Sequence, residues 1–207
     1  MPLLYSLKRT VNQSKFLQRL YDVSKKIVNV LPFYIVREGL SDGDVLNVKP
    51  KLDHCDVGFL KPSEIKVISA SPEVPETEDD LLERLSRNCL CLGIKHHGEI
   101  AAYMWCNLQE CDSNHIKFKL RKDEAYLFDA RTFRSYRGKN LAPYIRIELY
   151  RHLRQMGLTR FISITEYFNT SARRFKEKLN AKPQKLFMCI KFFMKYKWVL
   201  LLKSYEI

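Results

Sequence analysis

Alternating apolar and polar positions predict that much of this chain is built from β-strands. Residues 89–95 alternate in this way, residues 99–108 form a long, aromatic strand pattern, and His96-His97-Gly98 between them is typical of a hairpin turn. Residues 125–133 form an aromatic-rich strand pattern, and residues 160–165 form another. Further strand patterns, of which the last two are expected to pair antiparallel, occupy residues 33–37, 56–60, 116–120, 185–193 and 197–203.

Helical spacing of apolar residues appears between these strands. Four such segments start near Pro62, Asp79, Leu141 and Thr170. A fifth covers residues 11–31, where the apolar side chains share one face and the lysines and arginines lie elsewhere, and Pro32 is expected to end it. That helix either packs on its own domain or on a second copy, or it binds a membrane surface or an acidic partner.

The order of these elements predicts an α/β (α+β) fold. Antiparallel strands precede and follow a central strand–helix–strand unit, so we expect a mixed, mostly antiparallel central sheet flanked by helices. We expect residues 1–55 to form an N-terminal extension with a helix and a strand, and residues 56–207 to form the main domain.

Composition and charge narrow the function without defining it. The 207 residues carry a formal net charge of +13, which favours anionic partners such as phosphates, acidic proteins, nucleic acid or anionic lipid. No apolar run approaches the roughly 18 residues that a membrane-spanning helix needs. The six cysteines form no CxxC pair and no secretory signal is evident, so reduced thiols and a cytoplasmic location are expected.

A metal site is not expected, although cysteines and histidines gather in one part of the sequence. Cys89, Cys91, His96 and His97 do not have the spacing of the usual structural zinc sites. The two histidines occupy the tip of the predicted hairpin, where solvated turn residues are the expected case.

The most distinctive stretch, residues 124–157, predicts a strand, a short basic turn and a helix. A helix that begins directly after a turn presents free backbone N–H groups and the positive end of its dipole to an anion. Arg134, Arg137 and Lys139 add positive charge around this turn, and Gly138 allows a ligand to approach the backbone closely. The stretch therefore predicts a phosphate or pyrophosphate cradle, with a solvated basic turn as the alternative.

This stretch resembles the pyrophosphate loop of the GNAT acyltransferase superfamily, whose members bind acetyl-CoA or a longer acyl-CoA. The family's loop reads Arg or Gln, two residues, Gly, one residue, then Gly or Ala, and the matching positions here are Arg137, Asn140 and Ala142. A second match follows in register, at a helix whose corresponding positions are Asn169, Ala172 and Glu177-Lys178-Leu179. The resemblance covers roughly residues 56–203.

Two positions depart from the family's pattern. Asn140 replaces the middle glycine of the loop, and asparagine tolerates the left-handed backbone conformation better than most residues. Lys176 stands where many members carry a tyrosine that protonates the departing thiolate, and lysine removes that candidate.

The resemblance implies a GNAT-like acyl-CoA N-acyltransferase fold and transfer of an acetyl or longer acyl group from acyl-CoA to an amine by direct attack. The residues implied to bind the co-substrate are Ala130, Arg131, Thr132, Phe133, Arg137, Gly138, Lys139, Asn140, Leu141, Ala142 and Asn169. Asp129, beside the thioester end of the strand, is the candidate catalytic carboxylate, and Tyr167 is the candidate to reach the thiolate. The alternatives are a structural aspartate and a packed tyrosine.

Other functions stay open. A protein of the GNAT fold that binds acyl-CoA or an acyl carrier protein without catalysis would account for Asn140 and for the lysine at position 176. Nucleic-acid binding rests on charge alone, since no stretch interleaves aromatics with basic residues in the known way, and it is not expected. The sequence leaves open the amine acceptor, the acyl length and whether the protein forms a homodimer.

Overall fold

The computed structural model describes residues 27–39, 48–193 and 195–206. The strands within them are β1 (Val28–Glu38), β2 (Cys55–Phe59), β3 (Cys89–His96), β4 (Glu99–Asn107), β5 (Glu110–Asp112), β6 (Lys117–Lys119), β7 (Glu124–Thr132), β8 (Arg160–Glu166), β9 (Lys182–Phe192) and β10 (Tyr196–Ser204). The helices are α3 (Pro62–Ser69), α4 (Glu78–Ser86), α5 (Leu141–Gln155), α6 (Thr170–Lys178) and a short 3-10 helix, η1 (Arg134–Tyr136).

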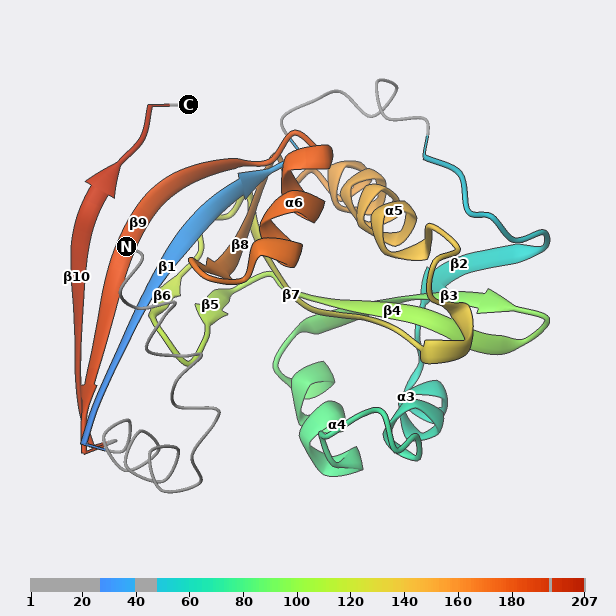
Figure 1. Ribbon diagram of the computed structural model, residues 1–207. Helices are drawn as coiled ribbons and strands as arrows, with labels where there is room; N and C mark the ends of the chain where they lie inside the picture. Colours follow the sequence, from blue (N-terminus) through green and yellow to red (C-terminus); the bar gives the residue numbers. More distant parts are fainter. Residues whose placement is uncertain (1–26, 40–47, 194, 207) are drawn as a thin grey trace, which may run out of the picture.

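The main sheet has the strand order β10-β9-β1-β8-β7-β4-β3-β2 (Figure 1). Only the central β7–β8 pair is parallel, and every other neighbouring pair in it is antiparallel. Strands β5 and β6 form a separate two-stranded sheet. The predicted mixed, mostly antiparallel sheet flanked by helices is therefore confirmed.

Strand β1 corrects one prediction. The predicted helix over residues 11–31 lies mostly outside the described residues, and the chain is already extended from Val28 onward. β-Branched Val28 and Val30 favour a strand, and Pro32 is accommodated because it lies one residue before β1 begins to pair with β8. Strand β1 lies between β8 and β9 within the main sheet. The division of the chain at residue 55 stays a prediction.

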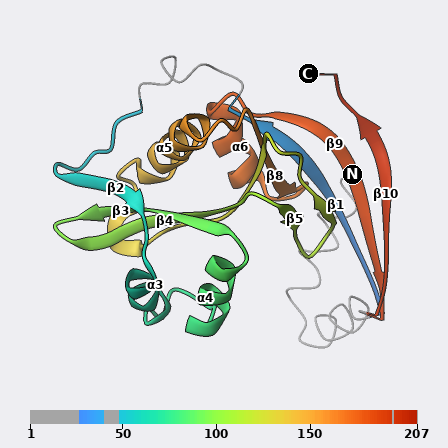
Figure 2. The same cartoon turned by 180° about the vertical axis from the view of Figure 1, so that it is seen from behind.

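Helices cover both faces of the half of the sheet that contains β3, β4 and β7 (Figures 1 and 2). Strand β4 is buried on both faces because its alternate residues pack against different helices. Met104 packs in one cluster with Leu149 of α5, whereas Trp105 packs in another with Ile68 of α3 and Leu81 of α4. No helix among the described residues is both long and apolar enough to span a bilayer.

The two central strands separate partway along their length. Strands β7 and β8 pair over residues 124–127 and 160–163, and from there β7 has a strand partner only on its β4 side. Asp129 lies just beyond this point in a β-bulge with a φ of 41°, where Phe128 and Ala130 take the paired positions around it. The edge of β7 that faces β8 is therefore open at the middle of the sheet.

Candidate functional site

The turn between β7 and α5 holds Asn140 in the left-handed conformation, with φ of 64° and ψ of 18°. Asparagine thus takes the backbone conformation for which glycine is usually needed, as the sequence predicted. The Asn140 side-chain amide donates to the Lys49 carbonyl oxygen at 2.9 Å, and Lys51 N–H donates to the Lys139 carbonyl oxygen at 2.9 Å. Gly138, with φ of 77°, has open space beside it. The turn is therefore braced from one side and open on the other.

Two adjoining pockets follow the end of β7 and the start of α5. Their volumes are about 390 and 320 Å³, and Thr132, Arg137 and Ala142 line both. Together they bring in eight of the residues predicted to bind the co-substrate: Ala130, Arg131, Thr132, Arg137, Gly138, Asn140, Leu141 and Ala142. The first N–H groups of α5 have no acceptor within the helix, so this end of the helix suits an anion.

Arg137 is the cation at the centre of these pockets. Its Nε donates to the Thr132 carbonyl oxygen at 3.2 Å, and its Nη2 lies 3.6 Å from Glu73 Oε2. The side chain is 61% exposed, so this contact leaves the guanidinium accessible to a ligand. Lys139, by contrast, lies 5.1 Å above the Tyr136 ring and lines neither pocket.

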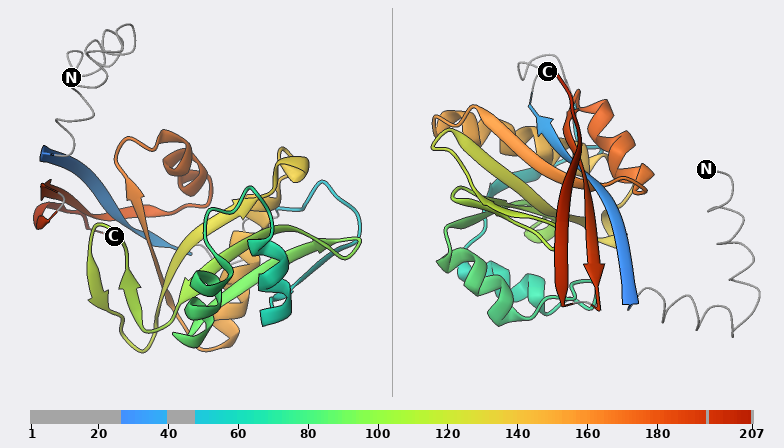
Figure 3. Two further views of the ribbon diagram at one scale, coloured as in Figure 1. Left: turned by 90° about the horizontal axis from the view of Figure 1, so that it is seen from below. Right: turned by 90° about the vertical axis from the view of Figure 1, so that its left-hand side faces the viewer.

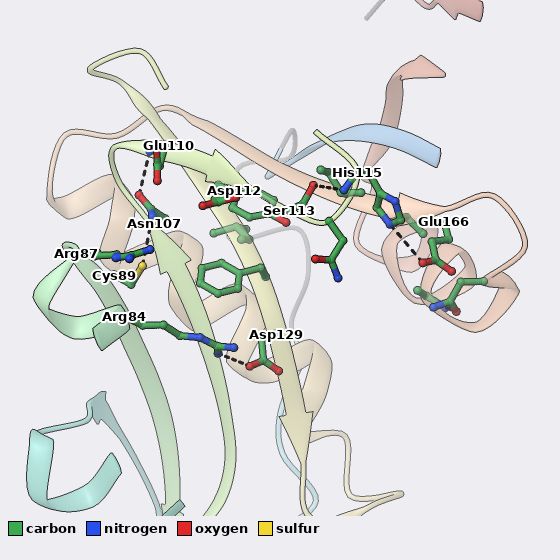
Figure 4. A pocket seen from close by; sticks show the side chains of 18 residues that line it. Arg84, Arg87, Cys89, Asn107, Glu110, Asp112, Ser113, His115, Asp129 and Glu166 are labelled. Carbon is green, nitrogen blue, oxygen red and sulfur yellow. Dashed lines mark hydrogen bonds and ion pairs between the residues drawn. The ribbon is translucent and has the colours of Figure 1, made fainter. Parts of the chain in front are cut away.

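A third pocket, of about 600 Å³, opens where β7 and β8 separate (Figure 4). Residues 126–129 of β7 and 164–166 of β8 form two of its walls, and β3, β4, α4, α6 and the β5–β6 hairpin contribute the others. Its charged lining consists of Arg84, Arg87, Glu110, Asp112, Asp129 and Glu166. Because Ala130 already lines the first pocket, β7 runs directly from one cavity to the next.

Arg84 holds the carboxylate of Asp129 in this pocket. Its Nη1 donates to Asp129 Oδ2 at 2.5 Å, and the guanidinium lies 5.3 Å from the centroid of the Trp105 ring and 5.5 Å from that of Phe128. Burial acts to lower the pKa of Arg84, but the hydrogen bond and charge of Asp129, with those of Glu76, outweigh it and raise that pKa. The Asp129 carboxylate therefore already accepts a charge-assisted hydrogen bond in the folded protein.

His115, which the sequence analysis did not single out, lines the same pocket on the side away from Arg84 (Figure 4). Its Nε2 lies 3.3 Å from Glu166 Oε1, and its ring stacks on Phe33 with centroids 5.1 Å apart. Burial lowers the pKa of His115 and outweighs the opposing charge of Glu166, so the ring is neutral at neutral pH and can accept a proton. No motif surrounds His115 in the sequence, and only the β5–β6 hairpin carries it to the pocket.

The remaining predicted site residues, Asn169, Tyr167 and Phe133, do not lie together. Asn169 lines the 600 Å³ pocket and also caps α6, because its Oδ1 accepts from Ala172 N–H at 3.0 Å. Tyr167 stacks on Tyr34 at 5.5 Å, and Phe133 packs against the cluster beneath α3 and α4. Neither Tyr167 nor Phe133 lines any of the three pockets.

A buried ion cluster links α6 to β1 and β8. Lys176 Nζ donates to Ser163 Oγ at 2.6 Å and to the Ile164 carbonyl oxygen at 3.1 Å, and it lies 3.6 Å from Glu38 Oε1. Arg146 Nη1 lies 3.5 Å from Glu38 Oε2. Burial lowers the pKa of Lys176 to about 8, despite the charge of Glu38. Lys176 therefore points into the protein interior and lines none of the three pockets.

The histidines and cysteines form no evident metal centre. His96 and His97 lie at the tip of the β3–β4 hairpin with their ring centroids 4.2 Å apart. Across the part of the chain that the structure describes, no group of three or more His, Cys, Asp or Glu side chains is arranged to hold a metal ion.

Comparisons with known proteins identify the family and the fold. The model of the acetyltransferase (GNAT) family matches residues 62–181. A GNAT-family protein from Novosphingobium aromaticivorans superimposes with a TM-score of 0.53 at 16% identity, over 86% of this chain and 66% of that one. A tandem GNAT protein from the clavulanic acid biosynthesis pathway gives a TM-score of 0.58 at 13% identity, over 86% of this chain and 55% of that one.

A third structure, a GCN5-related N-acetyltransferase-like protein from Streptococcus suis, gives a TM-score of 0.53 at 15% identity, over 87% of this chain and 69% of that one. At these identities the likeness shows a shared fold. The chain spans 66% and 55% of the lengths of the first two structures. No curated protein matches it.

Proposed function

We propose that this chain, which belongs to the acetyltransferase (GNAT) family, transfers an acyl group from acyl-CoA to an amine acceptor. The observation that carries the proposal is the course of β7. Its residues 130–132 line the pocket at the start of α5, and its residues 127–129 line the larger pocket beside β8. A thioester lying along β7 would have its phosphates at the first pocket and its reactive carbon at the entrance of the second.

The first pockets suit the co-substrate. Backbone N–H groups and the dipole at the start of α5 favour the pyrophosphate, and Arg137 adds a charge-assisted hydrogen bond. The pantetheine arm would lie beside residues 130–132, whose open edge can bond an extended chain as an added strand. Acetyl-CoA is the simplest donor, and a longer acyl-CoA fits the same scheme.

The larger pocket suits the acceptor. Its nitrogen attacks the thioester carbon, a C–N bond forms, the C–S bond breaks, and the amine proton must pass to a base. Asp129 is the predicted base, although it is held by Arg84, and the neutral His115 beside Glu166 is a second proton acceptor in the same pocket. Tyr167 remains the predicted donor of a proton to the departing thiolate.

Binding of CoA tests the first part of the proposal. We expect CoA or acetyl-CoA to raise the melting temperature of the protein, because a ligand that binds only the folded state stabilises it. Arg137→Glu should abolish this shift, since it places a negative charge where the phosphates bind. Arg121→Glu makes the same charge change at an exposed residue that lines none of the three pockets, and it should keep the shift. The absence of any shift at millimolar CoA would exclude the proposal.

Catalysis is tested separately by thiol release from acetyl-CoA with a free-amino-terminal peptide, a lysine-containing peptide, a polyamine and an aminoglycoside. Release that depends on one of these acceptors supports an enzyme. The second candidate is a binding protein without catalysis, which the interior position of Lys176 and the Arg84–Asp129 pair favour. Tight CoA binding with no release for any acceptor class would support that candidate.

A further inference from the structure

Strands β1, β9 and β10 form a wing at one edge of the main sheet (Figures 1 and 3). Residues directly opposite one another in paired strands, and alternate residues along a strand, lie on the same face. The register therefore places three rows of apolar residues on one face of the wing: Val28, Phe192 and Tyr196; Val30, Ile190 and Trp198; Pro32, Met188 and Leu200. We call these nine residues the apolar face.

Within the described residues, the inner strands of the wing are covered on the opposite face. There, Phe33 and Cys189 are fully buried in a cluster that includes Ile116 and Phe118, from the region of the β5–β6 hairpin (Figure 3). On the apolar face, the residues of the outer strand β10 stay about half exposed: Tyr196 53%, Trp198 53% and Leu200 52%. Contiguous exposed apolar surfaces of this kind are uncommon on proteins and often mark binding sites.

Lysines lie on both faces of the wing: the register places Lys203 beside the apolar face, and Lys191 and Lys197 on the opposite face. Residues 182–204, which contain all of β9 and β10, include no aspartate or glutamate and carry Lys182, Lys185, Lys191, Lys195, Lys197 and Lys203. At the tip of the hairpin, lysines alternate with aromatic residues, and Phe193 there is 59% exposed. The wing is therefore both apolar and strongly cationic.

We propose that the apolar face and the lysines of the β9–β10 hairpin bind the surface of an anionic lipid bilayer. Tyrosine and tryptophan rings suit the boundary between acyl chains and headgroups, because each has an apolar body and a polar atom. Lysine stems can lie along apolar surface while their ammonium groups contact anionic headgroups. The net charge of +13 attracts the whole molecule to such a surface.

Charge argues against a second copy of this chain that adds its β10 to the β10 edge of the wing. If β10 paired antiparallel with β10 of another copy about Leu200, Lys197 would lie directly opposite Lys203 of that copy. Like charges directly opposite each other in a sheet are destabilising. An anionic bilayer has the complementary charge, and this proposal is independent of any acyltransferase activity.

Flotation of the full chain with phosphatidylcholine vesicles, with and without phosphatidylserine, tests the proposal. We expect binding only when phosphatidylserine is present, and we expect added salt to weaken it. Fluorescence gives a second measurement, because the chain has two tryptophans and Trp105 is fully buried. Any blue shift on vesicle addition therefore reports Trp198, and we expect one.

Matched variants locate the surface. Trp198→Ser with Leu200→Ser, and separately Lys195→Gln with Lys197→Gln and Lys203→Gln, should each weaken vesicle binding about tenfold or more. The apolar control is Val67→Ser with Met156→Ser. Val67 and Met156 lie outside the wing and are 64% and 50% exposed. The charge control replaces three exposed lysines outside the wing with glutamine: Lys61, Lys122 and Lys178. Both controls should bind like the original protein.

Four results would overturn the proposal. The first is no binding beyond that to phosphatidylcholine alone, and the second is equal weakening by the control variants. The third is vesicle binding that both wing variants leave unchanged, which would assign it to another part of the chain. The fourth is a dimer in analytical ultracentrifugation that Trp198→Ser with Leu200→Ser dissociates, which would make a second copy the occupant.

Discussion

Asn140 takes the left-handed conformation at the start of α5 and also donates a hydrogen bond to the Lys49 carbonyl oxygen. Glycine adopts this conformation freely, whereas a β-branched residue is strained in it. We expect Asn140→Gly to keep the thermal shift caused by CoA. Asn140→Val should cost about 1–2 kcal/mol of stability and reduce the CoA shift. Thermal denaturation with and without CoA measures both, and equal behaviour of the two variants would contradict this account of the turn.

His115 is expected to impose a pH dependence on stability. Its pKa in the folded protein lies below the ordinary value of 6.5, so the unfolded chain takes up the proton first as pH falls. The free energy of unfolding should therefore decrease as pH falls below about 6.5. His115→Gln should remove this contribution, and melting curves between neutral and mildly acidic pH compare the two proteins. A difference that does not change with pH would show that the histidine does not titrate in this way.

The same residue has a kinetic test once an acceptor is known. If His115 takes the acceptor proton, His115→Gln should lower kcat/KM by roughly 10²- to 10⁴-fold and remove an acid limb of the pH profile. Asp129→Asn is the matched comparison in the same pocket. A large loss in Asp129→Asn alone would assign the base to Asp129 and leave His115 a structural role.

Sequence reasoning at the residue scale worked best where the chemistry is local. Arg137, Gly138 and Ala142 could be proposed together because one short turn and the helix after it hold them, and they line the same pair of pockets. His115 was missed because no neighbour in the sequence marks it. Its distance from Glu166 depends on how a small hairpin packs beside β8, which spacing along the chain does not reveal.

Among the elements, α6 carries a buried charge, Lys176, that contacts β1 and β8. Lys176 has a folded-state pKa of about 8 and an ordinary value of 10.5. Between these values the unfolded chain binds more protons, so this lysine makes the free energy of unfolding rise with pH across that window, by up to about 1.4 kcal/mol per pH unit. Below pH 8 the lysine is charged in both the folded and the unfolded state, so the full cost of burying the charge lowers the free energy of unfolding.

Lys176→Met is expected to remove this rise. The melting temperature of the original protein, relative to that of Lys176→Met, should therefore increase from pH 8 toward pH 10.5. Lys178→Met alters an exposed lysine of the same helix and should leave the pH dependence unchanged. A constant difference between the original protein and Lys176→Met would refute the effect.

The elements differ in how far the sequence alone could predict them. The β3–β4 hairpin and the β7–α5 unit follow from patterns in which neighbouring residues supply both the turn and the packing partner. Strand β1 was predicted only from residue 33 onward, because its first residues become a strand by pairing with β9, more than 150 positions later. The sequence pattern also does not predict where β7 and β8 separate, because this depends on how the two strands pair in the folded sheet.

At the scale of the whole molecule, the sheet separates two kinds of surface. The three pockets lie around β7, at the centre of the strand order, whereas the apolar face lies at the β10 edge. Lipid binding at the wing would therefore leave the open edge of β7 free. The family match establishes the fold class, but neither the fold nor composition identifies the acceptor, because the fold does not specify which charged side chains line the pocket.

The position of β1 between β8 and β9 also bears on the order in which the protein folds during translation. The ribosome makes residues 28–38 well before their strand partners, which are residues 160–166 and 182–192. The strand therefore cannot form these pairs until residues 160–192 have been synthesised. Contacts this distant carry a large loop-closure cost and form late. We therefore expect closure of the sheet around β1 to follow formation of the β3–β4 hairpin, whose two strands are neighbours in the sequence.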